Sequence, residues 1–150
     1  MYRHILIPTD GSEVAEHAVT NGLALAKSVG AKVTVMIVEH PFDWLSVPET
    51  RASQRQSLEA LAKHNEQVQK HAANVLGQAA DAAKQASVSC DTMQVANARP
   101  YQAIIVAASD RGCDLIVMGS HGRGGLSAVV LGSVTNKVLT HTKTPVLVYR

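Results

Sequence analysis

The chain has 150 residues, of which 46% are apolar and only 3% aromatic, and its formal net charge is +2. This length suits one domain with its own core, and that core has to be built from Val, Ile, Leu and Ala. The small charge, and basic residues that are not interleaved with aromatic ones, argue against nucleic-acid binding. No apolar run reaches the length that spans a bilayer, so we expect no membrane partner.

The cysteines and the N-terminal residues indicate a compartment. Residues 2–7 are typical of a strand and not of a signal peptide. Cys90 and Cys113 lie in or beside expected strands, without the spacing of metal ligands. We interpret them as buried small hydrophobic residues in a reducing compartment, and therefore expect a cytoplasmic protein.

The first part of the chain alternates strand and helix patterns. Residues 3–8 predict a strand, and Ser12 after it is suited to cap a helix through its hydroxyl. Apolar residues then recur at helical spacing, and Gly30 is suited to end that helix in a left-handed conformation. The continuous apolar run over residues 32–39 is typical of a central parallel strand.

A long helix is expected from about residue 53 to residue 86. The segment before it, residues 40–53, is irregular, because Pro41 and Pro48 exclude a regular helix. His64 and His71 stand about two turns apart, too far to share one metal ion, and are expected on a solvated face. The apolar stripe, expected to face the core, comprises Leu58, Leu61, Ala62, Val68, Ala72, Val75, Leu76, Ala79 and Ala83.

Further strands are expected over residues 88–96, 114–118 and 145–149, with helices from Pro100 to Gly112 and over residues 133–140. This alternation predicts one α/β domain over residues 1–150, Rossmann-like, with a single open five-stranded parallel sheet and helices on both faces. With strand order 3-2-1-4-5, a ligand is expected beyond strands one and four, where the order reverses.

The most informative motif follows the fourth strand. Gly119 and Gly122 come directly after it, and Gly132-Ser133 stand at the start of the last helix. Glycine lets backbone approach a ligand closely, and a helix N-terminus attracts anions. The spacing matches neither the Walker motif nor the dinucleotide fingerprint. It predicts a cradle for a phosphate chain; the alternative is that these glycines only make turns.

Single residues near this motif have competing interpretations. Asp10 is suited to contact a ligand, to bond its own backbone, or to do both. Arg123 is suited to phosphate, or it is an ordinary surface arginine. His121 has no carboxylate or second histidine beside it, and Ser133 lacks the nucleophile elbow. We therefore expect no catalytic residue and no metal ligand.

Three segments resemble the universal stress protein family: residues 7–12, the pattern Gly119-x2-Gly122-x9-Gly132-Ser133, and residues 144–148. The resemblance spans essentially the whole chain, and the glycine pattern resembles that of the family's ATP-binding branch. It implies the five-stranded fold, a homodimer paired through residues 145–149, and a link to survival under stress.

The resemblance also implies roles for individual residues. Pro8, Thr9, Asp10 and the backbone of Val38 would meet the adenosine portion, and Gly119 would lie near the ribose. The phosphates would be held by the backbone N–H groups of Gly132, Ser133 and Val134 and by the Ser133 hydroxyl. The full set expected to bind the nucleotide is Pro8, Thr9, Asp10, Val38, Met118, Gly119, Gly122, Arg123, Gly132, Ser133 and Val134.

These residues lead to one expected function and to alternatives. The expectation is a nucleotide-dependent stress-response or regulatory module that binds ATP, together with Mg²⁺ or Mn²⁺; AMP, ADP or a cyclic nucleotide are alternative ligands. A slow ATPase or nucleotidyl-transfer enzyme on the same scaffold is a second interpretation, although no general base is evident. The third is a nucleotide-independent interaction protein that uses the long helix and the preceding loop.

Overall fold

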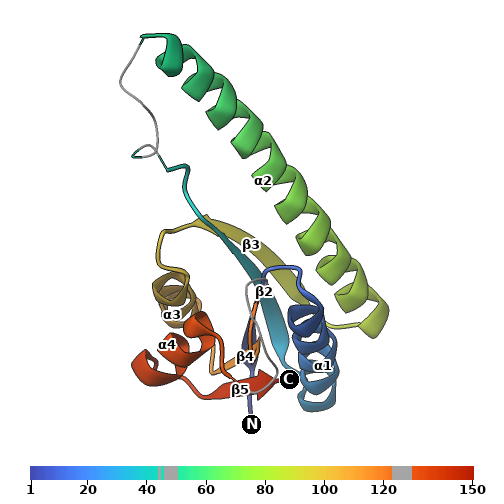
Figure 1. The fold of residues 1–150 in the computed structure, drawn as a ribbon. Coiled ribbons are helices and arrows are strands. Elements are labelled where there is room, and N and C mark those ends of the chain that lie inside the picture. Colours follow the sequence, from blue (N-terminus) through green and yellow to red (C-terminus); the bar gives the residue numbers. More distant parts are fainter. Residues whose placement is uncertain (44, 46–50, 123–129) are drawn as a thin grey trace.

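The computed structural model of the chain describes residues 1–43, 45, 51–122 and 130–150. Its helices and strands alternate as expected from the sequence (Figure 1). In chain order they are β1 (His4–Thr9), α1 (Glu13–Val29), β2 (Lys32–Glu39), α2 (Arg51–Ala86), β3 (Cys90–Ala96), α3 (Pro100–Asp110), β4 (Leu115–Gly119), α4 (Ser133–His141) and β5 (Val146–Tyr149).

The strands form one parallel sheet in the order β3-β2-β1-β4-β5, which confirms the predicted fold class. Helices α1 and α2 cover one face, and α3 and α4 cover the other (Figure 1). The chain order reverses between β1 and β4. The carboxyl ends of these two strands therefore lie side by side, and five of the residues predicted to bind a ligand lie in or next to them: Pro8, Thr9, Asp10, Met118 and Gly119.

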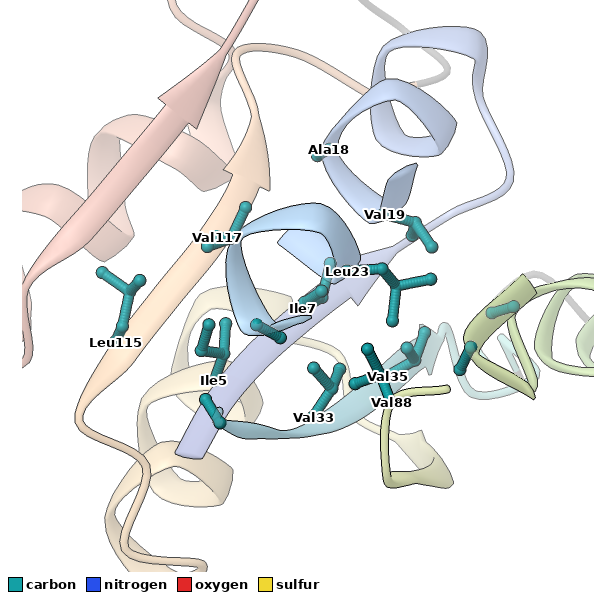
Figure 2. Packing of buried hydrophobic residues seen from close by; sticks show 14 residues of the cluster. Ile5, Ile7, Ala18, Val19, Leu23, Val33, Val35, Val88, Leu115 and Val117 are labelled. Atoms are coloured by element: carbon teal, nitrogen blue, oxygen red, sulfur yellow. The ribbon is translucent and has the colours of Figure 1, made fainter. Parts of the chain in front are cut away.

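The larger apolar cluster lies between the sheet and the pair α1 and α2 (Figure 2). Ile5 and Ile7 of β1 are fully buried there, next to Val117 of β4. Burying one such aliphatic side chain contributes about 1.5–3 kcal/mol. The buried members of the cluster are all aliphatic, as the composition requires, and Tyr2 and Tyr149 pack against it only as partly buried residues.

Most element ends match the sequence predictions. The Ser12 hydroxyl accepts a hydrogen bond from the Ala15 N–H at 3.3 Å, and Gly30 ends α1 with φ +71°. Strand β3 begins at Cys90, two residues later than predicted. Ser87 has φ +58°, and the Val88 N–H donates to the Ala83 carbonyl at 2.9 Å, so these two residues form the C-terminal cap of α2 and not the start of the strand.

The predicted apolar stripe of α2 is buried only in its second half. Ala72, Ala79 and Ala83 are buried, whereas Leu58 is 62% exposed. Figure 1 shows the first half of α2 extending away from the sheet. With 36 residues, the helix is about 54 Å long at 1.5 Å per residue. The eight residues of β2 span only about 26 Å, so the sheet is too short to cover the whole stripe.

Two further expectations about side chains need correction. Cys113 is buried as expected, but Cys90 is only partly buried because β3 is an edge strand. His71 is not on a solvated face: it is partly buried, and its Nε2 lies 3.2 Å from the Asp10 carbonyl oxygen. His64 is also partly buried, with its ring 5.6 Å from that of Phe42.

Among the described helices, none combines the length and the apolar character needed to cross a bilayer.

Candidate functional site

A cavity of about 450 Å³ lies at the carboxyl edge of the sheet, where the strand order reverses. This volume is within the usual range for small-molecule sites, about 300–1,000 Å³. Arg123 lies outside the described residues. The other residues predicted to bind a nucleotide all line the cavity: Pro8, Thr9, Asp10, Val38, Met118, Gly119, Gly122, Gly132, Ser133 and Val134.

The turn after β1 is fixed by its own side chains. The Thr9 hydroxyl accepts from the Gly11 N–H at 3.2 Å, and Asp10 Oδ1 accepts from the Ser12 N–H at 3.0 Å. The local role of Asp10 considered from the sequence is thus confirmed. A Cβ placed on Gly122 would lie 2.5 Å from Asp10 Oδ2. The backbone at Gly122 therefore lies against the Asp10 carboxylate, with no room for a side chain between them.

The other two motif glycines also mark close contacts. Neither has a left-handed φ. A Cβ on Gly119 would lie 2.9 Å from Val14 Cγ1 and 3.2 Å from the Val14 backbone. A Cβ on Gly132 would lie 3.0 Å from His121 Cα. These glycines thus do more than make turns, because they let α1 and the start of α4 pack against the end of β4.

Helix α4 points its N-terminus at the cavity. It is anchored there by the Thr135 hydroxyl, which donates to the Gly119 carbonyl at 2.9 Å, and by the Gly132 N–H, which donates to the Ser120 carbonyl at 2.7 Å. No described side chain caps this helix. The Gly132 N–H is already occupied, and the first bond within the helix runs from the Asn136 N–H to the Gly132 carbonyl. Among the described residues, the N–H groups of Ser133, Val134 and Thr135 are therefore the ones that the helix itself leaves for an anion.

Several lining residues were missed from the sequence. Glu39 and His40 directly follow Val38 at the end of β2, so the topology that selected Val38 would also have selected them. His71 reaches the cavity from α2, and nothing in the sequence shows how this helix packs. The missed residues are Ala15, Ile37, Glu39, His40, His71, Pro100, Ile104, His121 and Thr135.

Among the described residues, those with shifted pKa values lie away from this cavity. His4, at the opposite end of β1, is buried with Nε2 2.8 Å from Thr34 Oγ1 and Nδ1 3.0 Å from the Arg111 carbonyl. Burial lowers the pKa of His4. Burial also raises the pKa of the Cys113 thiol to about 11. Over the described part of the chain, no group of three His, Cys, Asp or Glu residues is placed to hold a metal ion.

Comparison with known proteins gives consistent matches over the full length. The model of the universal stress protein family matches residues 1–150. A universal stress protein of Thermus aquaticus is 32% identical over 151 residues, covering 100% of both chains. The solved structure of MJ0577 from Methanocaldococcus jannaschii has a TM-score of 0.80 at 28% identity, covering 99% of this chain and 96% of that one. A universal stress protein in complex with cAMP has a TM-score of 0.69 at 25% identity, covering 98% and 95%.

Proposed function

The chain belongs to the universal stress protein family, and from this premise we propose that it binds ATP and acts as a nucleotide-dependent module of a cytoplasmic stress response. One observation carries the proposal: the α4 N-terminus opens, without a described side-chain cap, on a cavity at the reversal of strand order. Such a helix end attracts phosphate groups. The relative solved with cAMP supports an adenine nucleotide as the ligand.

The proposed pose runs from α4 to β2. The phosphates lie against the Ser133 hydroxyl and the N–H groups of Ser133 and Val134, and Arg123 adds positive charge. The Gly122 backbone borders the phosphate chain, and Asp10, which lies against Gly122, meets the ribose. The base lies towards Val38 at the end of β2. Mg²⁺ or Mn²⁺ arrives with the nucleotide and neutralises phosphate charge.

We expect binding without efficient hydrolysis. Phosphoryl transfer needs a positioned water and a group to orient it, while Asp10 Oδ1 is already engaged by the Ser12 N–H. A few turnovers per hour correspond to a barrier of about 21 kcal/mol, and we expect hydrolysis to be no faster. Turnover near one per second would favour the ATPase interpretation instead.

We propose a homodimer paired through residues 145–149. Among the described strands, β5 pairs with β4 on one side and is the edge of the sheet on the other, and an exposed edge is suited to pair with a second copy. Leu147 on this edge is 37% exposed. Leu147→Asp should therefore give a monomer in sedimentation velocity. Leu139→Asp on α4, where Leu139 is 39% exposed, is the matched control and should remain dimeric.

The experiment that tests the proposed function uses protein purified without added nucleotide. Denaturation followed by mass spectrometry identifies any adenine compound carried through purification, and calorimetric titration with MgATP then measures affinity. We expect a Kd at or below the micromolar range, equivalent to about −8 kcal/mol. Failure of ATP, AMP and cAMP alike to bind would contradict the proposal and favour an interaction protein independent of nucleotide.

A further inference from the structure

Asp10 lies beyond the point where the sheet holds β1. The pairing of β1 with β4 ends at Leu6, and its pairing with β2 ends at Thr9. The hydrogen bonds that shape the turn after β1 are local, because they join residues two positions apart. Such bonds fix the shape of the turn, but they do not fix its position relative to the rest of the cavity. A contact with a more distant segment is needed for that.

Helix α2 supplies such a contact. His71 Nε2 lies 3.2 Å from the Asp10 carbonyl oxygen. Because a carbonyl oxygen only accepts hydrogen bonds, Nε2 carries the proton and donates in this contact. Of the described residues that line the cavity, His71 is the one that α2 contributes. It is therefore the point at which this helix meets both the cavity and the turn that carries Asp10.

Close packing holds the His71 side chain at this turn. Gly11 has φ +78°, and a Cβ placed on it would lie 2.8 Å from Val75 Cγ2 and 3.3 Å from His71 Cε1. His71 and Val75 are four positions apart on α2, so they share one face of the helix. Ala72, next to His71, is fully buried. The helix is therefore fixed against the rest of the protein at the level where His71 donates to Asp10.

The position of the Asp10 backbone decides what its carboxylate can recognise. A hydrogen bond weakens steeply when its geometry departs from the ideal, and in the proposed pose this carboxylate meets the ribose. We propose that His71 is a positioning residue: it holds Asp10 by its carbonyl and thereby sets the preference of the cavity for a nucleotide with ribose hydroxyl groups. This inference rests on the proposed nucleotide-binding function and gives α2 a part in selecting the ligand.

The test compares ATP with 2′,3′-dideoxy-ATP, which keeps the base and the phosphates but lacks both ribose hydroxyls. Calorimetric titration with the Mg²⁺ complex of each nucleotide gives the ratio of the two Kd values. A hydrogen bond from a hydroxyl to an ionised carboxylate should make wild-type protein bind ATP about 10- to 100-fold more tightly. His71→Leu removes the donor and should lower this ratio to about threefold or less. His71→Gln, whose amide N–H is suited to donate from a similar position, should recover most of the ratio.

A matched control and a double variant separate positioning from other roles. His64→Leu removes another partly buried histidine of α2 that does not line the cavity, and it should keep the wild-type ratio. Asp10→Ala removes the proposed ribose contact, so adding His71→Leu to it should change the ratio by less than about twofold. If the Asp10→Ala ratio stays high and His71→Leu then lowers it, His71 contacts the ribose itself and the positioning role is wrong.

The remaining outcomes are also decisive. A lower Tm of nucleotide-free His71→Leu, with equal weakening of both nucleotides, would assign His71 a structural role and overturn the proposal. An unchanged ratio in His71→Leu would also overturn it, while the proposed function stands. A wild-type ratio near one would show that Asp10 does not meet the ribose hydroxyls, so the inference would fail although nucleotide binding stands. If wild type binds no adenine nucleotide at all, both fail together.

Discussion

Replacing Ser133 by Asp should change stability and nucleotide affinity in opposite directions. Ser133 is the first residue of α4, is exposed, and lines the cavity. The first turn of α4 contains no acidic residue, so its positive end is not compensated there. A carboxylate at this position stabilises the helix through its dipole, but it occupies the place proposed for a phosphate.

Both effects have a magnitude that can be worked out. An acidic residue in the first turn of a helix contributes about 0.3–1 kcal/mol, which corresponds to a rise in Tm of about 1–4 °C for a domain of this size. Two like charges 4 Å apart repel by about 4 kcal/mol at an effective dielectric constant of 20. Solvent and Mg²⁺ screen part of this, so we expect a loss of about 2 kcal/mol, or about 30-fold in ATP affinity.

Thermal unfolding without nucleotide and calorimetric titration with MgATP measure the two effects separately. The matched control is Ser89→Asp, which adds the same charge at an exposed position just before β3, at the opposite edge of the sheet. It should bind ATP as wild type does. Unchanged ATP affinity in Ser133→Asp would refute the assignment of the phosphate site. A fall in both Tm and affinity would show that the variant is damaged, against the reasoning on the helix dipole.

Three further predictions concern stability and reactivity. Gly30→Ala should lower the free energy of unfolding by about 1 kcal/mol, because of the left-handed φ alone. Gly11→Ala should lower it by about 1 kcal/mol more, since its Cβ would also lie 2.8 Å from Val75 Cγ2. Equal losses for the two variants in urea unfolding would contradict this prediction. Burial lowers the pKa of His4 below 6.5, so the unfolded state binds the proton more readily. The free energy of unfolding should therefore fall as the pH drops below about 6.5, and His4→Gln should make its dependence on pH flatter in this range. The same slope in wild type and variant would contradict the contribution of His4. Because burial raises the pKa of Cys113 to about 11, iodoacetamide at about pH 8 should modify this thiol only after unfolding, and rapid modification of folded protein would be inconsistent with the packing.

The sequence predicted the fold and the edge of the sheet at which the cavity lies, because both follow from local patterns and topology. Ser12 and Gly30 mark the ends of α1 by their capping chemistry, and the alternation of apolar runs gives the parallel sheet. Once the strand order is known, the reversal between β1 and β4 selects the loops that carry Asp10 and Gly122. These inferences need only neighbouring residues and general rules of topology.

What the sequence did not reveal depends on contacts between distant segments. Helical periodicity shows which side of α2 is apolar, but not that the sheet ends before Leu58 and leaves it exposed. The contact between His71 and the Asp10 carbonyl joins residues 61 positions apart. Likewise, the Gly132 N–H is occupied because the chain returns to the Ser120 carbonyl. In each case the packing of one element on another decides the environment, and no local pattern encodes it.

The most direct test of the ATP site is to follow backbone amide signals by NMR while MgATP is added to ¹⁵N-labelled protein. The account predicts saturable shifts at Ser133 and Val134, in the first turn of α4 at the cavity, and at Gly122 and Val38 along the proposed path of the nucleotide. The amides around His4, at the opposite end of the sheet, should remain unchanged. Saturable shifts confined to other surfaces, or none at all, would contradict the claim that this cavity binds ATP.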